Sequence, residues 1–303
     1  MKKRQLGNSD LFVTEMGLGC MSIGTDEKAA CYIIDTALDE GINYFDTADL
    51  YDFGVNEKLV GAALKHVRDK VIIATKVGNR WNHEGTGWSW DPSKPYIKEQ
   101  IKNSLKRLGT DYIDLYQLHG GTIQDPIEET VEAFEELKAE GYIRYYGISS
   151  IRPNVIREYV KESKIVSVMM QYSILDRRPE EEVMPLLTEH GISVVTRGPL
   201  AKGLLSNRML DKATEKGYLD YSLEELREVL PWLKEKVASS RSFTEIALQY
   251  NLANPAVASV IAGASSPEQV RSNVAAVRSR ALTDKEIAVI KKLTKASVYQ
   301  DHR

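Results

Sequence analysis

Short apolar runs typical of β-strands recur along the whole chain. Several of them, such as the run that reads VIIATK, are apolar at nearly every position, which is typical of parallel strands covered on both faces. The pattern predicts eight strands, at Thr14–Gly19, Ile42–Asp46, Val71–Lys76, Asp111–His119, Arg144–Ser149, Val166–Gln171, Ser193–Arg197 and Ala258–Ala262.

Amphipathic helices are expected between these strands. Asp26–Glu40 and Ile97–Leu108 each carry one apolar stripe at helical spacing, and each is followed by a glycine that suits a helix C-terminus. Asp125 and Ser266 are each followed by Pro and, three positions on, by Glu or Gln, which predicts that they cap the helices that begin there. Pro185 interrupts another helical pattern, so a kink or a late helix start is expected.

Eight strands that alternate with helices fit two α/β architectures. A (β/α)8 barrel needs about 250 residues, whereas a doubly wound sheet usually comes with a second domain. No linker or low-complexity tract divides this chain, so we expect one TIM-barrel domain over residues 1–303. Residues 4–13 (RQLGNSDLFV) predict a β-hairpin ahead of the barrel, and Ala201–Tyr221 predicts a long loop.

Composition and charge exclude several classes of function. The 40 basic and 43 acidic residues leave a formal net charge of −3, which offers no footprint for a nucleic acid or an anionic membrane. No run of about 18 apolar residues occurs, and the first residues lack the apolar stretch of a signal peptide. Two cysteines without a Cys-x-x-Cys pair favour a reducing compartment, so a cytoplasmic location is expected.

Several well-known catalytic motifs are incomplete or missing. Residues 17–22 (GLGCMS) nearly match the dinucleotide-binding fingerprint, but Ser22 stands where the third glycine belongs. No P-loop and no His-Glu-x-x-His occur, and the five histidines are scattered, so no metal site is expected. Gly147–Ile151 lacks the final glycine of a nucleophile elbow, which argues against a serine hydrolase.

Ionisable side chains stand at the ends of three successive predicted strands. Asp46 ends the second strand, Lys76 the third and His119 the fourth, while Tyr51 lies in the loop after Asp46. Catalytic groups of a barrel come from the carboxyl ends of its strands, so these four side chains are expected to meet. Each has an ordinary structural explanation when taken alone, such as a buried ion pair or a packed ring. Together they favour a catalytic site.

The chain resembles the aldo-keto reductase family along nearly its whole length. The matching segments read GINYFDTADLYDFGVNEKLVGAAL, VIIATKVG, RLGTDYIDLYQLH, RYYGISS, VMMQYS, TRGPLAKGLL and IAGASSPEQVRSN. The resemblance implies a (β/α)8 barrel that binds a nicotinamide dinucleotide without a Rossmann domain. It also implies that Asp46, Tyr51, Lys76 and His119 form the family's catalytic tetrad.

These residue types suit the reduction of a carbonyl group. Hydride addition leaves an alkoxide that needs a proton, and an ordinary tyrosine is a poor donor near neutrality. An ammonium at Lys76 would stabilise the phenolate form of Tyr51, and Asp46 would hold the lysine in place. His119 would bind the carbonyl oxygen and orient it, while the hydride comes from the cofactor.

The resemblance also implies a cofactor site beside the tetrad. Ser149 and Gln171 are expected to bind the nicotinamide carboxamide, and Arg197 stands where many relatives stack an aromatic ring on the nicotinamide. The expected contacts to the pyrophosphate are Gly198, Pro199, Leu200, Gly203 and Arg208, and those to the adenosine are Gly263, Ser265, Gln269 and Asn273. Many relatives place Lys and Arg on the 2′-phosphate, whereas a second branch has Gly and Gln there, as this chain does, and binds NADP. NADP(H) is therefore the expected cofactor.

Val77–Pro95 is predicted to form a long loop after the third strand, on the active-site side of the barrel. The substrate pocket is expected beside this loop. Its tryptophans, together with two residues elsewhere, are expected to wall an apolar pocket for a carbonyl compound. A loop folded over its own hydrophobic residues explains the tryptophans as well. The residues expected in this pocket are Met21, Phe53, Trp81, Trp88 and Trp90.

The expected function is the NADPH-dependent reduction of aldehydes or ketones to alcohols, with a small-molecule carbonyl compound as the substrate. Two alternatives stay open. One is a redox-sensing regulatory subunit that binds NADPH with little turnover, and the other is a barrel that binds phosphorylated metabolites near Ser265–Gln269. The sequence predicts no oligomeric state, because no helix carries a heptad seam long enough to indicate assembly.

Overall fold

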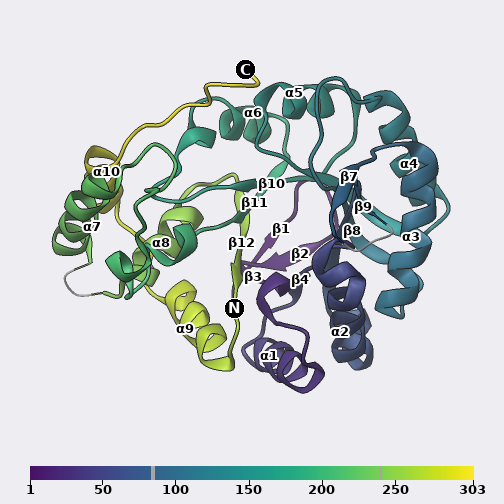
Figure 1. The fold of residues 1–303 in the computed structure, drawn as a ribbon, viewed down its shortest axis with the longest axis horizontal. Coiled ribbons are helices and arrows are strands. Elements are labelled where there is room, and N and C mark those ends of the chain that lie inside the picture. The colour runs from purple at the N-terminus through teal and green to yellow at the C-terminus, as the bar shows by residue number, and fades with distance from the viewer. Residues whose placement is uncertain (83–85, 239–240) are drawn as a thin grey trace.

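The computed structural model describes residues 1–82, 86–238 and 241–303, whose strands close a barrel (Figure 1). In this part of the chain, eight parallel strands pair in the ring order β10–β11–β12–β3–β4–β5–β8–β9. The predicted (β/α)8 TIM barrel is thereby confirmed. The barrel strands are β3 (Met16–Gly19), β4 (Tyr44–Asp46), β5 (Ile72–Val77), β8 (Ile113–Leu118), β9 (Ile143–Ser149), β10 (Ser167–Gln171), β11 (Ser193–Arg197) and β12 (Val257–Gly263).

Helices surround the barrel and cover the outer face of its strands (Figure 1). Helix α7 is an addition between β11 and α8, and it packs against α10. Across the described ranges, no helix is both long and apolar enough to cross a membrane. The α-helices are α1 (Glu27–Asp39), α2 (Val55–Leu64), α3 (Lys94–Leu108), α4 (Ile127–Ala139), α5 (Pro153–Glu162), α6 (Val183–Glu189), α7 (Leu223–Val237), α8 (Phe243–Ala253), α9 (Pro267–Arg278) and α10 (Asp284–Leu293).

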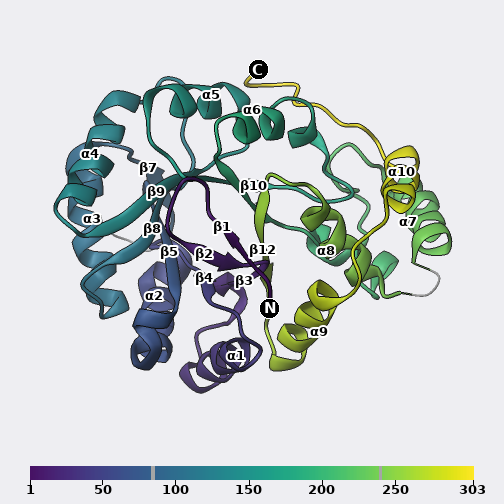
Figure 2. The same cartoon turned by 180° about the vertical axis from the view of Figure 1, so that it is seen from behind.

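An antiparallel hairpin of β1 (Lys3–Gln5) and β2 (Phe12–Thr14) lies across one end of the barrel, as the reverse view in Figure 2 shows. Leu6 and Leu11 of this hairpin are buried in a cluster with Tyr44 and other side chains of the barrel strands. The predicted hairpin is therefore confirmed. It covers one end of the barrel, and the carboxyl ends of the barrel strands lie at the opposite end.

The first barrel strand begins later than its apolar run predicts. Thr14 belongs to the hairpin strand β2, because the chain changes partners at Glu15. The Glu15 amide donates to Lys2 of the hairpin, whereas its carbonyl accepts from Val260 of β12. The predicted strand Thr14–Gly19 is thus divided between two sheets, and β3 starts at Met16.

The predicted long loop Val77–Pro95 contains a second hairpin, formed by β6 (Asn79–Trp81) and β7 (Trp88–Trp90). Its residues 83–85 lie outside the described residues. Helix α3 begins inside the predicted loop, with Pro95 in its first turn, where a proline costs no hydrogen bond.

One of the two predicted helix caps is wrong. Ser266 caps α9 by accepting from the amide of Gln269. The carboxylate of Asp125 does not cap α4, because it accepts instead from the amide of Thr122 at 2.7 Å and from Trp90 Nε1 at 3.0 Å. Elsewhere, α6 begins just before Pro185, which confirms a late helix start there.

Candidate active site

Lys76 lies in β5 with its side chain fully buried, and its ammonium group has three oxygen partners. Nζ lies 2.6 Å from Asp46 Oδ1, 2.7 Å from the carbonyl oxygen of Thr47 and 3.4 Å from Tyr51 Oη. Gln117 Nε2 donates to the second carboxylate oxygen of Asp46 at 3.3 Å. Because an ammonium group has three N–H donors, this arrangement directs one of them at the Tyr51 hydroxyl.

The ion pair between Lys76 and Asp46 holds a positive charge beside Tyr51. Burial lowers the pKa of Lys76 and is the largest single influence on it, but the charges of Asp46 and Tyr51 and the hydrogen bonds to them together raise the pKa above its ordinary value of 10.5. Burial raises the pKa of Asp46, while the Lys76 charge and hydrogen bonds from Lys76 and Gln117 oppose that rise. A positive charge this close to a phenol favours its ionised form, which is the form left after a proton has been donated.

The turn that carries Tyr51 has a strained backbone. Asp52 and Phe53 have φ angles of 48° and 51°, in the left-handed region that side chains other than glycine rarely adopt. Gly54 follows with a φ of 80°, and a Cβ there would lie 2.6 Å from Arg107 Cδ. Such strain persists only where the surrounding structure holds it, and it is common at catalytic sites.

A buried ion pair and an aromatic contact hold this turn. Glu57 of α2 is fully buried, and its two carboxylate oxygens accept from Thr75 Oγ1 and Arg107 Nε, each at 2.6 Å. The Arg107 guanidinium lies over the ring of Trp81, 5.4 Å from its centroid. Trp81 in turn meets Phe53 edge-on at a centroid distance of 5.8 Å. These contacts place the turn, and therefore the Tyr51 ring, against the end of β5.

His119 follows β8 and faces Tyr51. The two rings are nearly perpendicular, with an interplanar angle of 84° and centroids 6.0 Å apart. Burial, with smaller contributions from the positive charges of Lys76 and Arg197, lowers the pKa of His119 to about 3. The imidazole is therefore neutral near pH 7, and in that form it donates one hydrogen bond.

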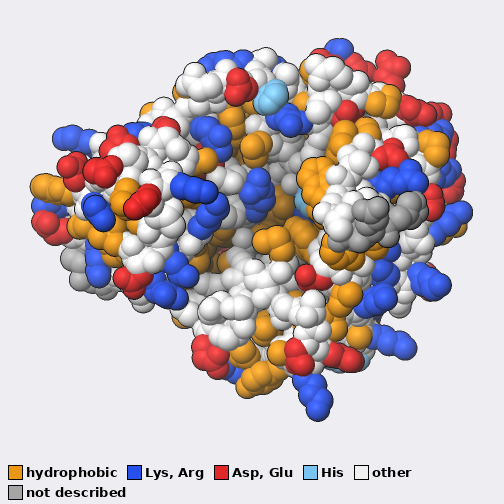
Figure 3. All heavy atoms as spheres, in the orientation of Figure 1, with side chains coloured by type: hydrophobic (Ala, Val, Ile, Leu, Met, Phe, Trp, Pro, Cys, Tyr) orange, Lys and Arg blue, Asp and Glu red, His pale blue; other side chains and the backbone are white. Residues whose placement is uncertain are grey.

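A cavity of about 1610 Å³ opens where the barrel strands end. In Figure 3 it is the hollow at the centre of the molecule, with Lys and Arg side chains along it. Asp46, Tyr51 and His119 line it, whereas Lys76 lies behind them, fully buried. The expected cofactor residues that line the same cavity are Ser149, Gln171, Arg197, Gly198, Pro199, Leu200, Gly203, Gly263 and Gln269.

Three expected cofactor residues, Arg208, Ser265 and Asn273, do not line this cavity. Ser265 instead donates its amide to Gln269 Oε1 at 3.0 Å, and so positions a residue of the wall. Asn273 is buried.

Of the side chains expected around the substrate, Met21 alone belongs to the described cavity wall. Phe53 and Trp81 pack on each other, as described above. Trp90 binds Asp125 through Nε1, and Trp88 is 57% exposed. The described tryptophans thus contact side chains outside the segment or solvent, and their role toward a substrate stays a prediction.

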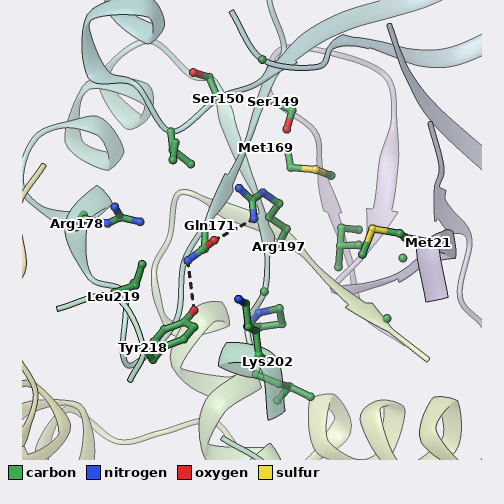
Figure 4. Close-up of a pocket in the computed structure, with 18 of the residues that line it drawn as sticks. Met21, Ser149, Ser150, Met169, Gln171, Arg178, Arg197, Lys202, Tyr218 and Leu219 are labelled. Atoms are coloured by element: carbon green, nitrogen blue, oxygen red, sulfur yellow. Dashed lines mark hydrogen bonds between the residues drawn. The ribbon is translucent and has the colours of Figure 1, made fainter. Parts of the chain in front are cut away.

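Gln171, Arg197 and Ser149 gather on one side of the cavity (Figure 4). Arg197 Nη1 donates to Gln171 Oε1 at 3.0 Å, and Gln171 Nε2 donates to Asp176 Oδ2 at 2.9 Å and to Tyr218 Oη at 3.3 Å. Asp176 is fully buried and also accepts from Arg178. The amide of Gln171 is thus held in one orientation by neighbours on both of its ends.

Several residues of the cavity wall were not predicted from the sequence. Lys202 stands inside the expected pyrophosphate turn but was assigned no role, and Arg152, Arg178 and Lys212 gave no signal. The C-terminal residues 296–302 also line the cavity, and their irregular sequence has no periodic pattern that would have indicated this.

The donor set of the cavity fits a nicotinamide dinucleotide. Five cationic side chains and three carboxylates line it, and Asp46 among the latter is already paired with Lys76. Gly198 and Gly203 adopt φ angles of 65° and 94°, which let the backbone of this turn approach a phosphate closely. Helix α9 begins at Pro267, close in sequence to Gly263, and its residue Gln269 lines the same cavity. Among the described residues, no group of three or more His, Cys, Asp or Glu could share a metal ion.

Comparisons with known proteins identify the family of the chain. Residues 15–295 match the Aldo/keto reductase family. The chain is 61% identical to the uncharacterized oxidoreductase YqkF of Bacillus subtilis, over all of both chains, and 34% identical to the NADH-specific methylglyoxal reductase of Escherichia coli, over 98% of this chain and 99% of that one. The holo form of aldo-keto reductase AKR11C1 from Bacillus halodurans superposes with a TM-score of 0.95 at 63% identity, covering 100% of this chain and 99% of that one. The protein thus belongs to the aldo-keto reductase family, whose members are oxidoreductases that act on carbonyl groups with nicotinamide cofactors.

Proposed function

We propose that the protein reduces aldehydes or ketones to alcohols with NADPH, and that Tyr51 donates the proton. The observation that carries this proposal is the position of Lys76 Nζ, 2.6 Å from Asp46 Oδ1 and 3.4 Å from Tyr51 Oη. Tyr51 and His119 face the same cavity, so a carbonyl oxygen between them meets a proton donor and a hydrogen-bond donor together.

Four side chains have separate roles in the proposed reaction. Bound nicotinamide supplies the hydride. Tyr51 gives its hydroxyl proton to the carbonyl oxygen, and Lys76 stabilises the phenolate that remains. Asp46 keeps Lys76 charged and directed at Tyr51. Neutral His119 donates a hydrogen bond to the carbonyl oxygen and so orients the carbonyl carbon toward the nicotinamide.

The same proposal assigns the cofactor to the cavity wall. Ser149 and Gln171 would hold the carboxamide, with Arg197 against the nicotinamide ring. The turn from Gly198 to Gly203 would bind the pyrophosphate, with Lys202 and Lys212 adding positive charge. Gly263 and Gln269 would contact the adenosine, whereas roles for Arg208, Ser265 and Asn273 stay predictions.

Replacement of Tyr51 by Phe tests the mechanism. The variant should lose reduction of an aromatic aldehyde, measured as the loss of NADPH absorbance, and should keep NADPH binding, measured by nicotinamide fluorescence. Tyr32→Phe, at an exposed tyrosine of α1, is the matched control and should turn over normally. Turnover near the parental rate in Tyr51→Phe would show that another group donates the proton.

A preference for NADPH over NADH is the finer part of the proposal. Lys202 and Lys212 supply positive charge to the cavity, which favours the more highly charged cofactor. Gln269→Glu would place a carboxylate near the 2′-phosphate and should weaken NADPH binding by about tenfold, with little effect on NADH. Gln5→Glu, in the hairpin at the other end of the barrel, is the matched control. Equal affinities of the parent for both cofactors would contradict the preference.

The alternative of a regulatory redox sensor is not favoured, because relatives in the comparisons carry the names of oxidoreductases and the four tetrad residues meet. Measurement of turnover also decides between the two: a sensor would bind NADPH tightly and consume almost none. Failure to bind micromolar NADPH would favour the phosphate-binding alternative instead.

Two smaller parts of the proposal concern the whole chain. We propose that residues 1–303 act as one domain, since β12 pairs with β3 and so joins distant parts of the chain in one sheet. Thermal unfolding should then show a single transition by every probe. Cys20 and Cys31 are both free thiols, in keeping with a cytoplasmic location, which cell fractionation tests.

A further inference from the structure

One cation of the cavity wall, Arg152, lies away from the elements assigned to the dinucleotide phosphates. It follows β9, which neighbours β8 in the barrel, and the end of β8 leads into His119. Lys202 and Lys212 follow β11, and Gly263 ends β12, farther round the ring. Arg152 is therefore on the same side of the cavity as His119, away from the elements assigned to the phosphates.

The guanidinium of Arg152 is anchored but not neutralised. Nη1 donates to the carbonyl oxygen of Gly121, two residues beyond His119, and the side chain is half-buried. No ion pair of Arg152 occurs among residues 1–82, 86–238 and 241–303. Arg178, in the same wall, is by contrast bound by both oxygens of Asp176, at 2.7 and 2.8 Å.

The unused donors of Arg152 match a specific kind of ligand. A guanidinium group has five N–H donors in a planar fork, and most of those on Arg152 have no protein acceptor in the described structure. The fork fits the two oxygens of a carboxylate or a phosphate.

We propose that Arg152 binds an anionic group on the carbonyl substrate, so that the enzyme prefers aldehydes or ketones that carry a carboxylate or a phosphate. The proposal rests on the proposed function, because it presumes that the carbonyl itself lies between Tyr51 and His119. The anionic group of the substrate would then extend past His119 toward the end of β9.

The test compares aldehydes that differ only in charge. The three carboxybenzaldehyde isomers and their methyl esters have the same aromatic aldehyde, and the three isomers sample different distances from the carbonyl to the anion. For the isomer that fits best, kcat/KM should exceed that of its ester by about tenfold or more at low salt, and the ratio should shrink as salt is added. Glyceraldehyde 3-phosphate against glyceraldehyde tests phosphate in the same way.

Variants assign the preference to Arg152. Arg152→Gln should bring the ratio of acid to ester close to one, mainly through a higher KM for the acid, and Arg152→Lys should keep part of the preference. The matched control is Arg157→Gln, which makes the same change on the exposed face of α5 and should leave the ratio unaltered. Binding of benzoate against benzamide, measured by calorimetry on the protein with NADP bound, gives a readout that needs no turnover.

Each outcome decides the matter. A ratio near one in the parent for all isomers and for the phosphate pair overturns the proposal, as does a preference that survives Arg152→Gln. An equal fall for acid and ester in Arg152→Gln assigns Arg152 only to supporting the Gly121 backbone. If the parent reduces no aldehyde at all, the proposed function fails, and the benzoate arm still decides whether Arg152 binds anions.

Discussion

The buried ion pair between Glu57 and Arg107 should contribute strongly to stability, and Arg107→Met is the change that exposes this. The variant keeps most of the apolar side chain but removes the charge that Glu57 meets at 2.6 Å. Glu57 is fully buried, and Asp49 is buried nearby. Burial raises the pKa of Asp49 most, and the Glu57 charge raises it further. In the variant the Glu57 carboxylate would therefore stay buried, without the positive charge that compensates it.

The expected cost follows from this burial. Removal of one partner from a buried pair costs about 3–5 kcal/mol in the free energy of unfolding. At about 2–4 °C per kcal/mol, the Tm should fall by roughly 6–20 °C. The same variant loosens the turn that carries Tyr51, so kcat should fall by more than the affinity for NADPH.

Differential scanning calorimetry and urea unfolding measure the effect, with Arg157→Met as the control. Arg157 pairs with Glu182 at 2.8 Å, but the two side chains are 42% and 38% exposed, so its loss should cost less than about 1 kcal/mol. Glu57→Gln combined with Arg107→Met should cost less than the sum of the single changes, because the double variant leaves no buried charge unpaired. If Arg107→Met unfolds at the temperature of Arg157→Met, the reasoning about burial is wrong.

Further expected outcomes concern the catalytic groups. Lys76→Met should lower kcat by about 10²–10⁴-fold while fluorescence still reports NADPH binding, and unimpaired turnover would remove the lysine from the mechanism. Because burial and nearby positive charges lower the pKa of His119 to about 3, the pH profile of kcat/KM should show no rise or fall caused by His119 ionisation between about pH 5 and pH 8. The unfolded chain binds a proton on this histidine below about pH 6.5 and the folded one does not, so the free energy of unfolding should decline as the pH falls from about 6.5 toward 3, less steeply in His119→Gln. Gly54→Ala forces a Cβ to within 2.6 Å of Arg107 Cδ and should reduce both Tm and kcat, and an unchanged Tm would contradict the strain described for this turn.

The barrel was predictable because each of its strands is a local apolar run bounded by turn residues. β11, at Ser193–Arg197, coincides with its predicted range. The boundary at Glu15 was not predictable, because it depends on a hydrogen bond from Val260, far away in the sequence. Asp125 does not cap α4 for a similar reason. Its sequence pattern is that of a cap, but its carboxylate accepts a hydrogen bond from Trp90, which is distant in the sequence.

The four tetrad residues could be brought together from the sequence alone, because strand ends in a barrel share one rim. The cavity wall was harder to predict, since Arg152 and the C-terminal residues 296–302 reach it through tertiary packing that leaves no periodic pattern. Trp81 shows a different kind of difficulty. An aromatic side chain in a rim loop suggests a substrate contact, but its ring is engaged by Arg107 and Phe53.

The pairing of β3 with β12 has a consequence for folding during protein synthesis. During translation β3 is the first barrel strand to leave the ribosome, and its partner β12 is the last. A nascent chain must therefore carry a sheet with an open edge through most of its synthesis, the condition in which strands are most prone to pair with other chains. The barrel, and with it the cavity, can close only when β12 has been translated. Activity should therefore appear in one step at the end of synthesis and should not increase gradually as the chain lengthens.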